Sequence, residues 1–376
     1  MGIDNNLTKK LEKSKIDMQN IGLYRTRNCI SNLDKNCNFS SNDYLSLSNH
    51  PTIKKAYQDG FSKYSVGSSG SVVISGYHKP HRDLEKYFAK ILEVDDCLLF
   101  SSGYTANLSV VSLLAKHEAS LVIDKSVHAS IYDGIKLSNA NFDRFLHNDI
   151  LSLRKKLKFQ TTQVILTESI FSMSGQIAPL ADIAKITNEN NANLIVDEAH
   201  GFGVIGRQGL GGVVNFGLGQ DDVPLRIIPF GKAVGACGAI VAGNGIWIEE
   251  LLQMRPAVYS TSISPAYAYG LLKAIEFICN SDDRRNKLSE LISYFKDKIR
   301  LSSLKWRDSE TPIQQLQYGC PHKAVATAEK LLASSIVCFP IRQPTVSKDE
   351  TGLRVILNYH HEVEDIDLLF KVLEEI

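Results

Sequence analysis

The sequence predicts an α/β protein with a large domain on a mostly parallel sheet and a smaller α+β C-terminal domain. Between about residues 41 and 245, short apolar runs alternate with amphipathic stretches, as expected for strands buried on both faces. After Ser264 this alternation gives way to two long helical runs and then to short β-like pieces. We expect an N-terminal helix and arm at 1–40, a large α/β domain at 41–263 and a small α+β domain at 264–376.

The composition is that of an ordinary globular protein, and it excludes several classes. Lys and Arg number 42 and Asp and Glu 41, so the net charge of +1 indicates no nucleic-acid partner. No run approaches the roughly 18 apolar residues of a membrane helix, and the N-terminal MGIDNNLTKKLEKSK lacks a signal-peptide core. The 7 cysteines are scattered and never in CxxC spacing, which predicts reduced thiols and no metal site. We therefore expect a cytoplasmic enzyme without a membrane partner.

The individual elements follow from local patterns. Residues 1–20 predict a polar helix, because only Leu7, Leu11 and Ile16 form an apolar stripe, and a turn-rich stretch follows to about Ser41. Apolar runs predict strands at Cys97–Phe100, Leu121–Ile123, Val164–Thr167, Leu194–Val196, Arg226–Pro229 and Gly238–Ala242. Amphipathic stretches predict helices between them at Asn107–Lys116, Ser130–Ser138 and Leu180–Asn190.

The C-terminal part has a different pattern. Helical runs are predicted at Pro265–Asn280 and Asp283–Leu301. Short β-like pieces then surround one predicted helix, Lys323–Ala333; they lie at Gln314–Tyr318, Val337–Ile341 and Gly352–Leu357. This change of pattern is the reason for expecting a separate α+β domain.

Chemically active residues follow several of the predicted strands. Open α/β sheets bind ligands beyond the carboxyl ends of their strands. At those ends the chain has the segments 101–107, 124–130, 168–173, 197–201 and 230–235. Taken singly, Asp197 is also explained as a helix cap, Lys232 as a loop lysine and His128 as a core histidine. Their joint placement is what indicates a site.

One chemistry needs this set of groups. A lysine amine forms a Schiff base with a cofactor aldehyde, and a buried carboxylate keeps a pyridine nitrogen protonated so that the ring accepts electrons. The N-terminus of a helix offers backbone N–H groups to a phosphate. Imidazole and hydroxyl groups stack on the ring and bind its phenolic oxygen. The implied ligand is pyridoxal 5′-phosphate.

A collinear series of motifs extends this interpretation over nearly the whole chain, from about Gly22 to Ile376. The motifs are Asn38–Leu45, Ser75–His81, Ser126–Ser130, His147–Asp149, Glu168–Met173, Val196–Gly201, Phe230–Lys232, Tyr259–Ser262 and Ile341–Val346. With them the chain resembles the α-oxoamine synthases, acyltransferases among the fold-type-I pyridoxal-phosphate enzymes. The segments 67–77 and 342–345 resemble most the branch that condenses L-alanine with a pimeloyl thioester. That branch releases CO₂ and forms 8-amino-7-oxononanoate in biotin biosynthesis.

The resemblance implies roles for individual residues. The catalytic positions are Lys232, which binds the cofactor and removes the Cα proton, Asp197 at the pyridine nitrogen and His128 on the ring face. The implied cofactor-binding residues are Gly103, Tyr104, His128, Ser172, Asp197, His200 and Lys232. Among them, Gly103 and Tyr104 would serve the phosphate, and Ser172 and His200 the phenolic oxygen.

Further residues are implied for the substrates. Arg354, with Asn42, matches the group that binds the amino-acid carboxylate, and Arg25 and Thr345 match positions for the acyl substrate. The resemblance also implies a homodimer with shared active sites, in which Tyr259–Ser262 reaches the partner's phosphate site. The acyl donor, coenzyme A or acyl carrier protein, is left open.

The position three residues before the lysine departs from the family pattern. The family usually has Thr or Ser three residues before the lysine, where this chain has Pro229. Proline has neither hydroxyl nor N–H. We therefore expect one phosphate hydrogen bond fewer, about 0.5–1.5 kcal/mol or up to about 3 with a charged partner, and weaker cofactor retention without loss of activity. Glu168 matches an acidic residue near the cofactor whose role is not defined.

Three alternatives stay open. A sister α-oxoamine synthase, namely glycine C-acetyltransferase, 5-aminolevulinate synthase or serine palmitoyltransferase, would use the same Lys232 and Asp197. An aminotransferase or lyase on the same fold would act without a thioester. A non-catalytic binding module would not need the intact lysine, aspartate and histidine set.

Overall fold

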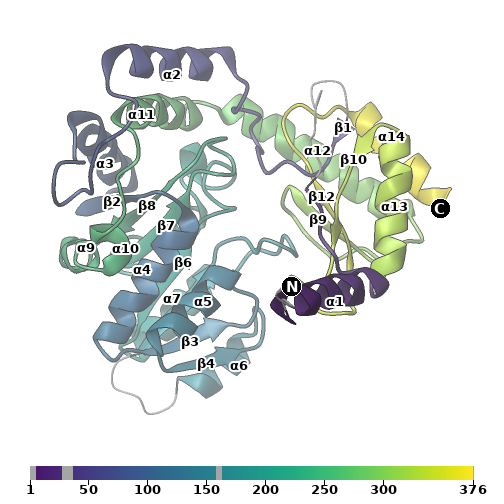
Figure 1. Cartoon of the computed structure of the whole chain (residues 1–376), viewed down its shortest axis with the longest axis horizontal. Helices are drawn as coiled ribbons and strands as arrows, with labels where there is room; N and C mark the ends of the chain where they lie inside the picture. The colour runs from purple at the N-terminus through teal and green to yellow at the C-terminus, as the bar shows by residue number, and fades with distance from the viewer. Residues whose placement is uncertain (1–5, 28–36, 158–162, 376) are drawn as a thin grey trace, which may run out of the picture. The chain divides into compact units, whose positions relative to one another are not determined.

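The computed structural model describes residues 6–27, 37–157 and 163–375. By their internal contacts these residues form two compact units (Figure 1). The larger unit comprises 42–172 and 176–287, and the smaller one comprises the described residues up to Ser41, 173–175 and those from Leu288 onward. The larger unit extends past the expected boundary at 263 because α11 (Pro265–Cys279) packs against α2 (Pro51–Lys63) and α3 (Lys79–Leu92). The domain boundaries expected from the sequence stay a prediction.

Among the described residues of the larger unit, seven strands form one sheet in the order β2-β8-β7-β6-β5-β3-β4. Their bounds are β2 Asp96–Phe100, β3 Ser120–Asp124, β4 Phe142–Phe145, β5 Gln163–Glu168, β6 Asn193–Asp197, β7 Leu225–Pro229 and β8 Ala239–Gly243. Strands β4, β3, β5, β6 and β7 run parallel, whereas β8 is antiparallel to both β7 and β2. The predicted α/β fold with a mostly parallel sheet is confirmed.

Helices cover both faces of this sheet. The remaining helices of the unit are α4 Gly103–Lys116, α5 Ala129–Ser138, α6 Ile150–Lys156, α7 Leu180–Glu189, the short η2 Arg207–Gly209, α8 Gly212–Asn215, α9 Gly245–Leu252 and α10 Arg255–Val258. In β5, Val164 and Leu166 pack into a core with α4, α5 and α9, whereas Ile165 packs into a second core with α6 and α7. Successive side chains of a strand point to opposite faces, and this explains why the strands read as continuous apolar runs.

The six predicted strands all lie at observed strands, but β4 was not predicted. Asp143 and Arg144 interrupt its apolar pattern, and only Phe145 of this edge strand is buried. Charged side chains are common on edge strands because they discourage pairing with another chain. The apolar pattern therefore predicts the buried strands but not this edge strand.

The smaller unit combines short strands with helices. Strands β11 (Pro340–Ile341), β12 (Gly352–Ile356) and β9 (Ile313–Gln317) form an antiparallel sheet, and β1 (Cys37–Asn38) pairs with β10 (Ile336–Val337). The helices are α1 Asn6–Asn20, α13 Pro321–Ala333, α14 Val363–Glu374 and α12 Asp282–Leu301, which begins in the larger unit. None of the helices in the described ranges has both the length and the apolar character needed to cross a membrane.

Helix α14 was not predicted, although its pattern was present. Ile366, Leu369, Phe370 and Leu373 are buried and recur at helical spacing. The helix follows the last strand of the unit and packs against α13, so the unit has a second helix beside its strands.

Candidate active site

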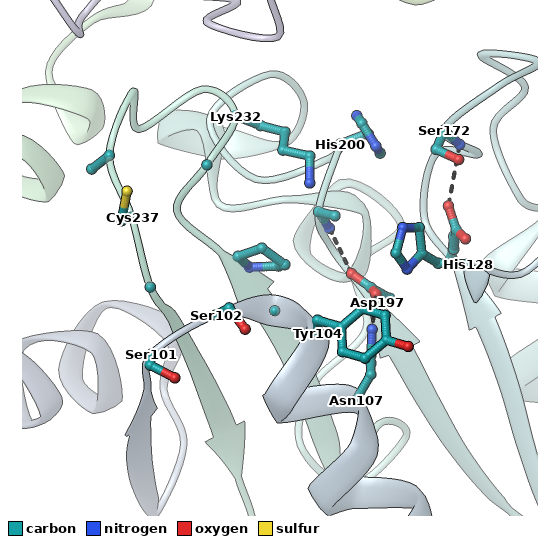
Figure 2. Close-up of a pocket in the computed structure, with 17 residues that line it drawn as sticks. Ser101, Ser102, Tyr104, Asn107, His128, Ser172, Asp197, His200, Lys232 and Cys237 are labelled. Carbon is teal, nitrogen blue, oxygen red and sulfur yellow. Dashed lines mark hydrogen bonds between the residues drawn. The ribbon is translucent and has the colours of Figure 1, made fainter. Parts of the chain in front are cut away.

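The carboxyl ends of the sheet strands hold a cavity of about 360 Å³. This volume lies within the range of small-molecule sites. Every residue predicted to bind the cofactor lines it: Gly103, Tyr104, His128, Ser172, Asp197, His200 and Lys232. Figure 2 shows several of these side chains directed into the same space. Sequence reasoning placed them at separate strand ends, and the sheet brings them together.

Asp197 is one of the buried carboxyl groups that line the cavity. It ends β6, is only 3% exposed, and accepts hydrogen bonds from Asn107 Nδ2 and the Ala199 backbone N–H, both at 2.9 Å. Burial raises the pKa of Asp197 above its usual value, and these hydrogen bonds, together with Lys232 and His128, offset only part of that effect. A carboxylate held in this way suits the protonated nitrogen of a pyridine ring.

Lys232 lies in the hairpin that joins β7 to the antiparallel β8. The hairpin is closed by bonds from the Gly235 N–H to the Lys232 carbonyl at 2.8 Å and from the Phe230 N–H to the Gly238 carbonyl at 2.9 Å. The amine of Lys232 reaches the cavity that Asp197 also lines (Figure 2). The connection therefore positions one primary amine at the carboxyl end of β7.

The start of α4 forms another wall of the cavity. Ser102 caps the helix by accepting a hydrogen bond from the Thr105 N–H at 3.2 Å. A Cβ atom at Gly103 would lie 2.6 Å from Pro229 Cγ, so only glycine fits against the proline ring. The free N–H groups at the start of this 14-residue helix suit a phosphate.

His128 and Ser172 contribute an imidazole ring and a hydroxyl group. His128 is the N-cap of α5, and its Nδ1 lies 2.7 Å from Ser130 Oγ. Burial lowers the pKa of His128, although the Asp197 carboxylate opposes this effect. A neutral imidazole is suited to stacking on an aromatic ring.

Glu168 also lines the cavity, although no role was defined for it. It ends β5, is 1% exposed, accepts a hydrogen bond from the Ser172 N–H at 3.2 Å and stands opposite Asp197 in the β5–β6 pair. Burial and the charge of Asp197 raise the pKa of Glu168 well above its usual value. The cavity thus has two adjacent buried carboxyl groups.

Asn107 and Tyr44 were not predicted as site residues. Asn107 lies one turn into α4 and donates to Asp197, a placement that its helical spacing from Gly103 could have suggested. Tyr44 is fully buried, and its Oη lies 2.6 Å from His200 Nδ1. Tyr44 lies in one of the recognised motifs, but nothing local to it indicated this partner.

The predicted substrate residues are divided between the units. Asn42 belongs to the larger unit, and Arg25, Thr345 and Arg354 belong to the smaller one. Arg25 Nη2 donates to Thr345 Oγ1 at 3.0 Å, so the structure brings these two residues together. Arg354 lies in β12 opposite Gln315. The substrate roles of these four residues stay predictions.

Comparison with known proteins agrees with this geometry. The sequence model for aminotransferase class I and II matches residues 34–373. A curated 8-amino-7-oxononanoate synthase of Pseudomonas fluorescens is 40% identical over 339 residues, which cover 90% of this chain and 86% of the relative.

Solved structures extend the comparison to three dimensions. The 8-amino-7-oxononanoate synthase of Francisella tularensis has a TM-score of 0.81 at 31% identity, over 91% of this chain and 98% of that one. A serine palmitoyltransferase with pyridoxal phosphate has a TM-score of 0.91 over 99% and 98% of the two chains; at 22% identity it supports the fold alone.

The cavity residues fit the cofactor of these enzymes. They provide one amine, a hydrogen-bonded carboxylate, two imidazoles and a helix N-terminus around a single cavity. The expected resemblance to the α-oxoamine synthases is confirmed. The chain belongs to the 8-amino-7-oxononanoate synthase family of fold-type-I, pyridoxal-phosphate-dependent transferases.

Proposed function

We propose that this chain is an acyltransferase that condenses L-alanine with a pimeloyl thioester. The products are 8-amino-7-oxononanoate, CO₂ and the free thiol carrier, and the reaction belongs to biotin biosynthesis. The observation that carries the proposal is the convergence of Lys232, Asp197 and His128 on one cavity, in a chain 40% identical to a curated synthase of that name.

The cavity residues would perform the proton chemistry. When bound, pyridoxal phosphate supplies an aldehyde for amines and a ring that accepts an electron pair. Lys232 would hold the cofactor through its amine, and once freed that amine would take the Cα proton of alanine. Asp197 holds a proton at the pyridine nitrogen, because its carboxylate is fixed by Asn107 and Ala199.

Other residues would orient the reactants. His128 would cover one face of the ring, and Ser172 and His200 would bind the phenolic oxygen. His200 is itself oriented by Tyr44, whose Oη lies 2.6 Å from its Nδ1. Arg354, with Asn42, binds the alanine carboxylate. Holding the reacting atoms in line supplies much of the rate acceleration of such condensations.

The acyl substrate and the assembly form part of the same proposal. Arg25 and Thr345, which share a hydrogen bond of 3.0 Å, bind the acyl substrate. The chain acts as a homodimer with shared active sites, and its exposed Tyr259, with 77% of its surface accessible, belongs to the segment that reaches the partner. Coenzyme A and acyl carrier protein both remain open as thiol carriers.

The test is an absorbance titration of the cofactor-loaded protein with L-alanine, glycine and L-serine, followed by pimeloyl-coenzyme A or pimeloyl-acyl carrier protein. We expect L-alanine to change the visible band most, and 8-amino-7-oxononanoate to appear by mass spectrometry only after a pimeloyl thioester is added. A preference for glycine or L-serine with another acyl thioester would assign a sister synthase instead. Turnover with an oxoacid and no thioester would assign an aminotransferase.

A further inference from the structure

A line of polar side chains, buried at Asp124 and partly buried at His147 and Gln176, joins these three residues in the larger unit. Asp124 ends β3 and has no exposed surface. His147 Nδ1 lies 3.1 and 3.3 Å from the two carboxylate oxygens of Asp124, and His147 Nε2 lies 3.0 Å from Gln176 Oε1. His147 belongs to one of the motifs recognised in the sequence, yet the proposed reaction gives it no role.

The Asp124 end of this line of side chains holds the turn that carries His128. Asp124 Oδ1 accepts a hydrogen bond from the Ser126 N–H at 2.7 Å, and the Asp124 carbonyl accepts one from the Val127 N–H at 3.2 Å. His128 follows directly as the N-cap of α5. Asp124 therefore holds the backbone turn from which the His128 side chain projects.

The other end holds the loop that carries Ser172. Gln176 accepts a hydrogen bond from the Phe171 N–H at 3.0 Å through its backbone carbonyl, and Ser172 is the next residue. The ring of His147 meets that of Phe171 edge to face, with centroids 4.2 Å apart. Asn148, next to His147, donates to the Ile177 carbonyl at 3.1 Å. His147 thus contacts the Ser172 loop through both a polar and an aromatic partner.

We propose that His147 is a positioning residue for the cofactor. Through Asp124 it sets the ring of His128, and through Gln176 it sets the hydroxyl of Ser172. The proposal rests on the proposed roles of His128 and Ser172. Histidine suits this place because its two ring nitrogens are fixed relative to each other, so one rigid ring ties two loops at a constant spacing. Partners outside a site that orient the groups inside it commonly affect function in this way.

Conservative substitutions at 147 separate the two polar contacts, the one with Asp124 (the His128 arm) and the one with Gln176 (the Ser172 arm). Asparagine at 147 places an amide near the position of Nδ1 and keeps the contact with Asp124, whereas glutamine places its amide near Nε2 and keeps the contact with Gln176. Phenylalanine keeps the ring packing on Phe171 and loses both polar contacts. All variants are prepared as full-length, cofactor-loaded protein without substrate.

Each arm has its own measurement. The His128 arm is followed by the cofactor dissociation constant, and the Ser172 arm by the pH titration of the visible band of the lysine-bound cofactor. For His147→Gln we expect the cofactor dissociation constant to rise about fivefold, the net effect of about one hydrogen bond, with little change in the titration. For His147→Asn we expect a shifted titration with little change in affinity, and for His147→Phe both changes.

The control is His117→Asn, because His117 is an exposed histidine of the same unit that contacts Glu250. It should match wild type in both measurements. The proposal would be overturned if His147→Asn and His147→Gln changed both measurements equally, in proportion to a loss of folded protein in thermal unfolding. It would also be overturned if all three variants behaved like wild type. These measurements use no substrate, so they do not depend on the proposed reaction. If that reaction is wrong, the product will be absent from the separate assay, while the spectra of the His147 variants will still differ from that of wild type.

Discussion

Glu168 and Asp197 place two carboxyl groups side by side at the ends of β5 and β6, and both are at least 97% buried. Two adjacent buried carboxylates repel each other, so one keeps its proton. Asp197 accepts hydrogen bonds from Asn107 and Ala199 and lies near Lys232, all of which favour its charged form. Glu168 is therefore the group of the pair that keeps its proton, in keeping with its raised pKa.

The cofactor-free protein tests this assignment through pH. An acid with a raised pKa in the folded state contributes stability below its unfolded pKa of about 4.3, and that contribution is lost as pH rises. Glu168→Gln keeps the shape of the neutral acid and cannot ionise. As the pH rises from 5 to 8, we expect the melting temperature of this variant to increase relative to that of wild type. A constant difference over that range would mean that Glu168 is ionised in the folded protein.

Pro229 leads to a prediction about cofactor affinity. Its ring lines the cavity and packs against Gly103, but it offers no hydroxyl to a phosphate. Pro229→Thr should lower the cofactor dissociation constant about two- to tenfold, the effect of one added hydrogen bond. Pro229→Val controls for the change of shape. Equal affinity of the threonine and valine variants would show that the hydroxyl makes no such bond.

Lys232 is predicted to be the only residue that binds the cofactor covalently. Lys232→Ala should abolish the visible band of the lysine-bound cofactor, whereas Lys116→Ala, at a surface residue that pairs with Glu250, should leave it unchanged. The measurement is the absorbance spectrum after reconstitution and removal of free cofactor. A retained band in the alanine variant would assign the covalent bond to another lysine.

At the scale of elements, the loop after β6 is held by a buried ion pair. Glu198, which has no exposed surface, accepts hydrogen bonds from the Gly212 and Val213 N–H groups at 2.8 Å each. Arg226 of β7, 2% exposed, donates to Glu198 at 3.2 Å. The pair thus closes the loop in which His200 lies and joins it to the neighbouring strand.

Breaking this pair from one side leaves a charge buried without its partner. Glu198→Gln or Arg226→Met should each lower the free energy of unfolding by about 3–5 kcal/mol. The double variant should lose less than the sum of the two, because no lone charge is left. Urea unfolding monitored by circular dichroism measures all three. Additive losses would indicate that the two side chains act independently.

The elements themselves were largely predictable from the chain. The apolar runs of β3, β5, β6 and β7 are recognisable because both faces of each strand are buried. The edge strand β4 buries one residue and carries charges, so its pattern resembles that of a loop. Local patterns therefore identify the buried strands of the sheet and miss its charged edge strand.

At the scale of the whole molecule, two loops of the larger unit expose apolar side chains. Val66, Ile74 and Tyr259 are 75%, 82% and 77% exposed, and a bridge between Ser71 and Thr261 joins the two segments. Exposed apolar groups gathered in this way favour contact with another protein surface. A second copy of the chain is the partner that the proposed homodimer requires.

This leads to a test of the assembly. The wild-type protein should sediment as a dimer, and Ile74→Asp should shift it toward monomer, because a charge would be buried in the contact. Leu137→Asp is the control, since Leu137 is 73% exposed on α5, away from the bridged segments in sequence. A monomeric wild-type protein, or equal behaviour of both variants, would argue against a contact at these loops.

The sequence by itself determined the fold class, the family and the residues expected at the site, because these depend on local patterns and on collinear motifs. Lys232 and Asp197 could be placed at strand ends from the few residues around them. Only the tertiary structure decided that Asn107 holds Asp197, that Tyr44 meets His200, and that His147 joins the loops of His128 and Ser172. These contacts join residues from distant parts of the chain. They depend on the order of strands in the sheet, where β5 lies between β3 and β6, and a pattern that extends over a few residues carries no information about that order.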